Sequence, residues 1–305
     1  MILGILSILG ACLCWGFIFI IPQFLSDYSA IAIAVGRFFF FGLASLAFLV
    51  IKKRSLLDKK FFSFWRQASI LSFVATIVQY VGLVLCLRYA NPSIGALIYG
   101  LAPITISLSG TWKKQGFDLR KFFLPGLLTF SGLILINLDA FQLTNSSPTE
   151  YLFGLFCGFV GLSSWTWYAV VNAEFMEKNQ GISPLDWATM FGTATFCIVS
   201  GMILCYLPFS PQKSLQQLSP EFMIGCAILG IVSTYAAFLF WNHGTKKLPI
   251  HLVGQLAVFE MIFALLFIFI IEKRLPLISE IGGILFILAA VLIVLNREKQ
   301  ILQQE

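Results

Sequence analysis

Charged residues are scarce in this chain. They make up 11% of its 305 residues, against about 25% in soluble globular proteins. Hydrophobic residues make up 59%, and the 32 phenylalanines are more aromatic surface than a soluble protein of this length could keep from water without aggregating. The composition therefore excludes a soluble globular domain and predicts a polytopic membrane protein.

Catalytic and metal-binding motifs are absent as well. There is no Walker A phosphate loop and no CxxC pair, and the seven cysteines all lie inside apolar runs. The only histidines, His243 and His251, flank a basic loop, and no serine, cysteine or carboxylate pair accompanies them at a recognisable catalytic spacing. We therefore expect no enzyme, no metal site, no cofactor and no ATP-driven chemistry, and cysteines that serve as small packing residues.

Apolar runs of about 20 residues, bounded by charge, proline or polar clusters, predict an all-α membrane protein with ten transmembrane helices. The expected helices are 2–24, 29–51, 67–89, 92–112, 121–139, 151–175, 184–207, 222–244, 249–271 and 278–296. Lysine and arginine are concentrated in alternate connections, such as Lys52-Lys53, Lys113-Lys114 and Lys246-Lys247. Because cytoplasmic connections carry the excess of these residues, both termini are expected in the cytoplasm, and the net charge of +6 is no argument for nucleic-acid binding.

The two halves of the chain resemble each other. Trp15 in LCWGFIFIIP matches Trp165 in SSWTWYAVVN, and LRYANPSIGALIYGLAPI matches TKKLPIHLVGQLAVFEMI. We therefore expect a first five-helix repeat in 1–140, a periplasmic connection in 141–150 and a second five-helix repeat in 151–305. An odd number of helices turns the second copy upside down, which gives the inverted repeat of many secondary transporters, with a site near the midplane.

A lone carboxylate, Glu260, lies in the middle of the apolar run from Pro249 to Ile271. A charge at this depth costs at least about 2.5 kcal/mol on insertion scales, so the side chain is expected to face a bundle interior or a wet cavity. Glu260 is thus a candidate for binding a substrate ammonium group or for proton coupling. The alternative is a structural acid that fixes the helix. Arg37, early in the second helix, could extend outward or pair with Glu260 or Asp27.

Other polar and aromatic side chains also lie at mid-depth. Trp165, Tyr168 and Asn172 share one face of their helix with two glycines, so the rings could stack on a substrate while the amide orients it. For this face the alternative is close helix packing, with the rings filling space. For Gln79, Tyr80 and Tyr99 it is an interhelical hydrogen bond, and for Trp241 it is an anchor at the membrane interface. The complete set of expected substrate-binding residues is Gln79, Tyr80, Tyr99, Trp165, Tyr168, Asn172, Trp241, Asn242 and Glu260.

Several of these segments resemble a known family. The WG pair of the first helix, Arg37, the Pro103 segment, the Glu260 segment ending in IEKRL and the closing Gly282-Gly283 helix resemble the drug/metabolite transporter superfamily, specifically its EamA-type ten-helix members. Within it, SSWTWYAVVNAEFM and YAAFLFWNHGTKKLP are most similar to the bacterial aromatic amino acid exporter branch. The chain also departs from the family in two places. TWKKQG, at the end of the fourth helix, lacks the acidic residue that is usual there. Met261 replaces the usual proline, so it is left open whether the ninth helix is kinked.

Pattern and resemblance together predict a secondary transporter that moves a small metabolite across the bacterial inner membrane by alternating access. The resemblance implies an amino acid as substrate and favours export, by facilitated diffusion or proton exchange. The expected partners are this substrate, the lipid bilayer and, where Glu260 titrates, protons; the oligomeric state is left open. Alternatives are a transporter of another metabolite or drug, and a non-transporting scaffold or enzyme. Gln79, Asn172 and Glu260 argue against a scaffold, which needs no polar groups at mid-depth.

Overall fold

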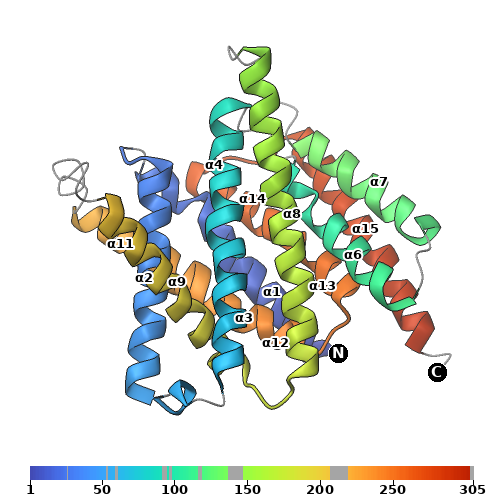
Figure 1. Ribbon diagram of the computed structural model, residues 1–305. Coiled ribbons are helices and arrows are strands. Elements are labelled where there is room, and N and C mark those ends of the chain that lie inside the picture. Colours follow the sequence, from blue (N-terminus) through green and yellow to red (C-terminus); the bar gives the residue numbers. More distant parts are fainter. Residues whose placement is uncertain are drawn as a thin grey trace.

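The computed structural model describes residues 1–25, 27–52, 54–58, 61–90, 95, 98–115, 119–136, 147–206 and 219–302, and across these ranges every regular element is a helix. The helices, shown in Figure 1, are α1 (Ile2–Gly16), α2 (Ala30–Lys52), α3 (Phe62–Ser72), α4 (Gln79–Tyr89), α6 (Ala102–Gln115), α7 (Leu119–Ile136), α8 (Pro148–Lys178), α9 (Pro184–Tyr206), α11 (Pro220–Gly230), α12 (Ala237–Thr245), α13 (Ile250–Ala257), α14 (Phe259–Glu272) and α15 (Ile278–Leu302).

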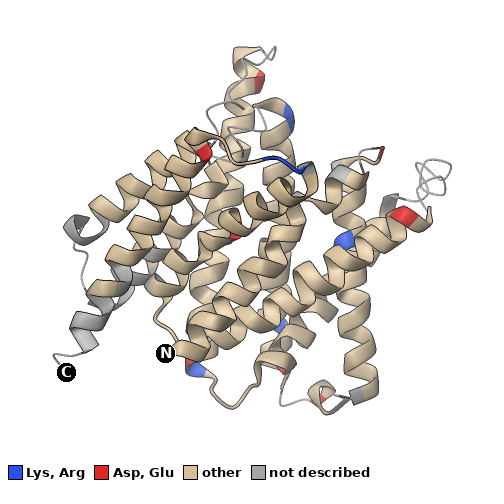
Figure 2. Cartoon of the chain, turned by 180° about the vertical axis from the view of Figure 1, so that it is seen from behind, with Lys and Arg blue, Asp and Glu red and all other residues tan. Residues whose placement is uncertain are grey.

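Within the described residues, six helical segments are long and apolar enough to cross a membrane. They cover Ile31–Ile51, Phe62–Tyr89, Pro148–Lys178, Pro184–Cys205, Pro220–Thr245 and Leu252–Ile271. Shorter apolar helices cover Ile2–Gly16, Phe123–Leu135 and Ile278–Ile293. Large apolar side chains such as Phe156 and Leu204 point outward, and Figure 2 shows long stretches of helix without a charged residue. The chain is therefore an all-helical membrane protein, as its composition predicts.

The helices pack in pairs that join the two halves of the chain. In the first half, α1 packs against α12 and α14, α2 against α9, α4 against α8, α6 against α13, and α7 against α15. Every one of these contacts links residues before 137 to residues after 147. The two halves therefore form one core, whose largest buried cluster includes side chains of both.

The first predicted helix, 2–24, is wrong at its C-terminal end. The α-helix stops at Gly16, and the chain continues in two 3₁₀ turns, Phe17–Phe19 and Ile21–Leu25. Pro22 lies in the second turn, where its missing N–H and fixed backbone angle are unfavourable for a continued α-helix. An apolar pattern alone does not distinguish these turns from a further α-helical turn.

Two long helices each contain a π-helical segment. Phe73–Val78 joins α3 to α4, and Ile231–Ala236 joins α11 to α12. In the second segment the Thr234 hydroxyl donates to the Leu229 carbonyl, five residues earlier, at 2.8 Å. Such π-helical turns are rare and frequently accompany functional sites. Here they set the direction in which the residues of α4 and α12 face the core.

The helix that carries Glu260 is broken at Val258, between α13 and α14. The Val258 N–H donates to the Gln255 carbonyl at 3.4 Å and the Met261 N–H to the Val258 carbonyl at 3.1 Å, which are the i to i+3 bonds of a tighter turn. The Cys12 thiol of α1 donates to the Leu256 carbonyl at 3.5 Å. The break therefore forms without a proline, beside a tertiary contact from α1.

Close packing of α2 on α9 requires a glycine at position 42. A Cβ at Gly42 would lie 2.5 Å from the Phe196 Cβ and 2.6 Å from its Cα. We therefore expect Gly42→Ala to cost about 1–3 kcal/mol and to lower the thermal unfolding temperature in detergent by several degrees. Gly201→Ala is the control, since nothing lies within 4 Å of that position on α9. Equal unfolding temperatures for the two variants would contradict the packing argument.

Candidate functional site

The centre of the molecule holds a cluster of aromatic side chains from three helices. Trp15 of α1 lies with its ring centroid 5.7 Å from that of Trp165 and 5.2 Å from that of Trp241. Tyr168 lies 5.2 Å from Trp165 and 5.8 Å from Phe238. Trp241 is fully buried in this cluster, so the alternative of an anchor at the membrane interface is wrong. Sequence analysis used Trp15 for the repeat match and for the family resemblance and did not list it as a binding residue, although its ring is central here.

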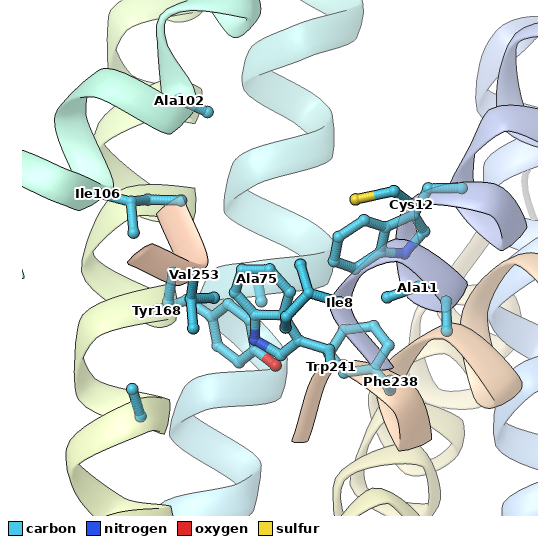
Figure 3. Close-up of a cluster of buried hydrophobic side chains, with 14 of the residues drawn as sticks. Ile8, Ala11, Cys12, Ala75, Ala102, Ile106, Tyr168, Phe238, Trp241 and Val253 are labelled. Atoms are coloured by element: carbon cyan, nitrogen blue, oxygen red, sulfur yellow. The ribbon is translucent and has the colours of Figure 1, made fainter. Parts of the chain in front are cut away.

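Two polar atoms of the aromatic cluster have no hydrogen-bond partner among the described residues. They are the hydroxyl oxygen of Tyr168 and the indole nitrogen Nε1 of Trp241, and both side chains are fully buried. Figure 3 shows the two side chains converging from α8 and α12. A buried donor without a partner costs about 1–3 kcal/mol, so both groups would gain from a ligand that accepts hydrogen bonds.

Asn172 and Asn242 form a separate buried network. The Asn172 Nδ2 donates to the Asn242 Oδ1 at 2.9 Å, and the Trp187 Nε1 of α9 donates to the Asn172 Oδ1 at 2.7 Å. All three side chains are buried. The network ties α8, α9 and α12 together, so Asn172 makes interhelical hydrogen bonds in addition to the close packing expected as the alternative for its face. Sequence analysis did not identify Trp187, because nothing in its own segment indicates the partner on α8.

Removing the indole donor of Trp187 tests this network. We expect Trp187→Phe to lower the stability by about 1–3 kcal/mol, because the buried Asn172 oxygen loses its partner while the ring packing is largely kept. The measurement is thermal unfolding in detergent. Trp167→Phe is the matched control, since Trp167 is 44% exposed on the outside of α8. A shift no larger than that of the control would show that the bond adds no stability.

Arg37 and Glu260 carry opposite charges that attract each other inside the protein, and they are here termed the charged pair. The Arg37 Nε donates to the Thr234 Oγ1 at 2.8 Å, which places the guanidinium against the π-helical segment before α12. The guanidinium interacts electrostatically with both Glu260 and Tyr80. Of the two partners foreseen for Arg37, the structure therefore supports Glu260, whereas Asp27 is exposed. The pair joins α2, α4 and α14 around one polar centre.

The carboxyl group of Glu260 belongs to the first residues of a helix. Glu260 is half-buried and lies in the first turn of α14, directly after the break at Val258. The N-terminal end of a helix carries a partial positive charge, which stabilises an acidic side chain there. The Cys12 thiol of α1 also lies beside Glu260, one helical turn from Trp15. Through α1, the charged pair therefore adjoins the aromatic cluster.

The remaining expected residues, Gln79, Tyr80 and Tyr99, make contacts outside the aromatic cluster. The Tyr99 hydroxyl donates to the backbone carbonyl of Gln79 at 2.8 Å and packs against Gly161. Tyr80 packs edge-on against Phe38, with ring centroids 5.9 Å apart. The nine expected residues thus separate into the charged centre with Tyr80, the aromatic cluster, the asparagine network and the Gln79 and Tyr99 contact.

A charged pair beside a buried aromatic cluster, in an all-helical membrane protein, points to a protein that binds a small polar molecule within the membrane. Residues 2–138 match the model of the EamA-like transporter family. The resemblance to this family that the sequence predicts is therefore confirmed for residues 2–138. A special closeness to the aromatic amino acid exporter branch remains a prediction.

Two named relatives and one solved structure extend the similarity along the chain. The inner membrane protein YtfF of Escherichia coli (strain K12) is 25% identical over 98% of this chain and 97% of its own length. The uncharacterized transporter YyaM of Bacillus subtilis (strain 168) is 22% identical over 81% of this chain and 80% of its own. A protein known from a crystal structure is 18% identical, with a TM-score of 0.78 over 98% of both chains, and so shares the fold.

Proposed function

We propose that this protein is a secondary transporter that moves an amino acid across the bacterial inner membrane by alternating access, with export favoured. The observation that carries the proposal is the Arg37 and Glu260 pair, placed at a helix break beside the aromatic cluster. Charged groups at this depth are costly and commonly belong to a transport path. The family match of residues 2–138 and the printed names of the two relatives support the transporter class.

The proposal includes two inverted five-helix repeats, residues 1–140 and 151–305, with ten spans and both termini in the cytoplasm. Three pairs of matching features support it. The π-helical segments Phe73–Val78 and Ile231–Ala236 lie in corresponding helices, and turns at Leu101 and Val258 precede α6 and α14. The contact of α4 with α8 corresponds to that of α12 with α1. In such an arrangement, alternating access is a movement of the two repeats about the central site.

An amino acid would use the central groups as follows. Its ammonium group would face the Glu260 carboxylate, and its carboxylate would accept hydrogen bonds from the Tyr168 hydroxyl and the Trp241 indole, which have no other partner among the described residues. Its side chain would pack against Trp15 and Trp165. Tyr80 lies near Arg37, Gln79 and Tyr99 lie against Gly161 of α8, and the bond between Asn172 and Asn242 holds α8 to α12.

The test is transport by purified protein in liposomes, with a panel of radiolabelled amino acids and protein-free liposomes as the control. We expect exchange of at least one amino acid. The resemblance to the aromatic amino acid exporter branch predicts that aromatic amino acids are among those exchanged. Failure to move any member of the panel would overturn the amino acid proposal. A thermal shift produced only by nucleosides or polyamines would then assign the same transporter class to another substrate, because a ligand stabilises the state it binds.

A further inference from the structure

A cleft of about 270 Å³ opens between the C-terminal turns of α8 and the segment that joins α12 to α13. Val170, Ala173, Glu174 and Glu177 line one wall, at spacings of three and four that place them on one face of α8. One water molecule needs only about 10–15 Å³ on this measure, so the cleft has room for a small solute. None of the residues expected from the sequence lines this cleft.

The two walls of the cleft carry opposite charges. Two carboxylates, Glu174 and Glu177, project from α8, while Lys246 and Lys247 lie on the segment opposite. Glu174 is half-buried, and Glu177 and Lys247 are exposed. Apolar side chains, including Val170 and Leu248, complete the lining. A lining of this kind is complementary to a small molecule that has one positive group, one negative group and an apolar part.

Lys246 holds the second wall in place. Its ammonium group donates to the backbone carbonyls of Gln180 at 2.9 Å and Ile182 at 2.7 Å, both in the connection between α8 and α9. An ammonium group has three donors, so two are used for this attachment. Lys246 therefore fixes the α12 to α13 segment, and Lys247, beside it, is the lysine left to attract a ligand.

The inner end of the cleft adjoins the asparagine network. Ala173 follows Asn172 on α8, and the Thr245 hydroxyl donates to the Asn242 carbonyl at 3.2 Å. Tyr168, one helical turn before Asn172, and Trp241, directly before Asn242, belong to the aromatic cluster. The hydrogen bond between Asn172 and Asn242 thus lies between the cleft and the central site.

We infer that this cleft is a loading site for zwitterionic solutes, and that the hydrogen bond between Asn172 and Asn242 closes the path from it to the aromatic cluster. The solute's ammonium group faces Glu174 and Glu177, and its carboxylate faces Lys247. This inference rests on the proposed function and adds a second, peripheral site to it. The asparagine bond must break for a solute to pass from one site to the other.

Charge-neutralised variants in liposomes test the charge assignment. L-Phenylalanine is the zwitterionic probe, with phenethylamine and 3-phenylpropionate as competitors that keep only its positive or only its negative group. We expect Lys247→Gln to weaken the binding of L-phenylalanine and 3-phenylpropionate about three- to tenfold and to leave the binding of phenethylamine unchanged. Glu174→Gln should weaken the binding of L-phenylalanine and phenethylamine and leave the binding of 3-phenylpropionate unchanged. Equal effects on all three probes, or none, would overturn the assignment.

Labelling with a membrane-impermeant maleimide tests occupancy directly. Glu177→Cys places a thiol at an exposed position of the cleft, and Gly181→Cys places one just beyond it, where nothing lies within 4 Å. Labelling is measured above that of the unsubstituted protein. L-Phenylalanine should slow labelling at position 177 and not at 181. If the protein transports L-phenylalanine but the solute does not protect position 177, and the charge-neutralised variants keep their affinities, the loading site alone is overturned. Absence of all amino acid transport would overturn the proposed function and this inference together.

Discussion

Arg37→Met is expected to abolish transport and to lower the thermal unfolding temperature more than any other single substitution discussed above. The substitution keeps the apolar stem and removes the guanidinium that donates to Thr234 and attracts Glu260. Breaking a fully buried ion pair costs about 3–5 kcal/mol, because the other charge is left without compensation. Arg37 and Glu260 are half-buried, so this range is the upper limit of the expected loss. Transport and thermal unfolding of the purified variant measure the two effects.

A double-mutant cycle separates the charge from the shape of the side chain. If the loss arises from an uncompensated Glu260 carboxylate, Arg37→Met combined with Glu260→Gln should be more stable than Arg37→Met alone. Arg37→Lys keeps the charge and loses the fixed Nε bond to Thr234, so it should have an intermediate effect. Additive losses in the double variant would show that Arg37 and Glu260 act independently.

The helices could be predicted from the sequence because lipid imposes a length and a composition on them. The described α2, α8 and α9 begin and end within a few residues of the predicted ranges 29–51, 151–175 and 184–207. The π-helical segments and the break at Val258 could not be predicted in this way. They depend on hydrogen bonds between helices, such as that of Cys12 to the Leu256 carbonyl, and no local pattern encodes such a bond.

The candidate site could be predicted in part, because the spacing of residues along a helix shows which side chains share a face. Helical spacing placed Trp165, Tyr168 and Asn172 on one face, and they do lie on one face of α8. Their neighbours could not be predicted, because these belong to other helices. Trp165 and Tyr168 join the aromatic cluster, whereas Asn172 pairs with Asn242. One face of a helix thus contributes to two different environments.

Glu260→Gln is expected to make transport independent of pH while the protein remains folded. The groups that face Glu260 are the Cys12 thiol of α1 and the Arg37 guanidinium of α2, with Tyr80 of α4 beyond the guanidinium. None of these is a second carboxyl, so among these groups Glu260 is the one carboxyl group that could carry a proton between the two sides. The initial rate of amino acid exchange, measured from about pH 5.5 to 8.5, checks this.

The two roles open to Glu260 differ in what else this substitution changes. If the Glu260 carboxylate binds the substrate ammonium group, Glu260→Gln should weaken the binding of L-phenylalanine. The binding of an uncharged analogue such as 3-phenylpropionamide should be unaffected. A carboxyl that only carries protons should, when replaced, leave substrate affinity unchanged and convert proton-driven accumulation into simple exchange. Arg37 is near enough to interact with Glu260 in this structure, so substrate or a proton must compete with it for the carboxylate. Unchanged pH dependence in Glu260→Gln would assign coupling to another group or to none.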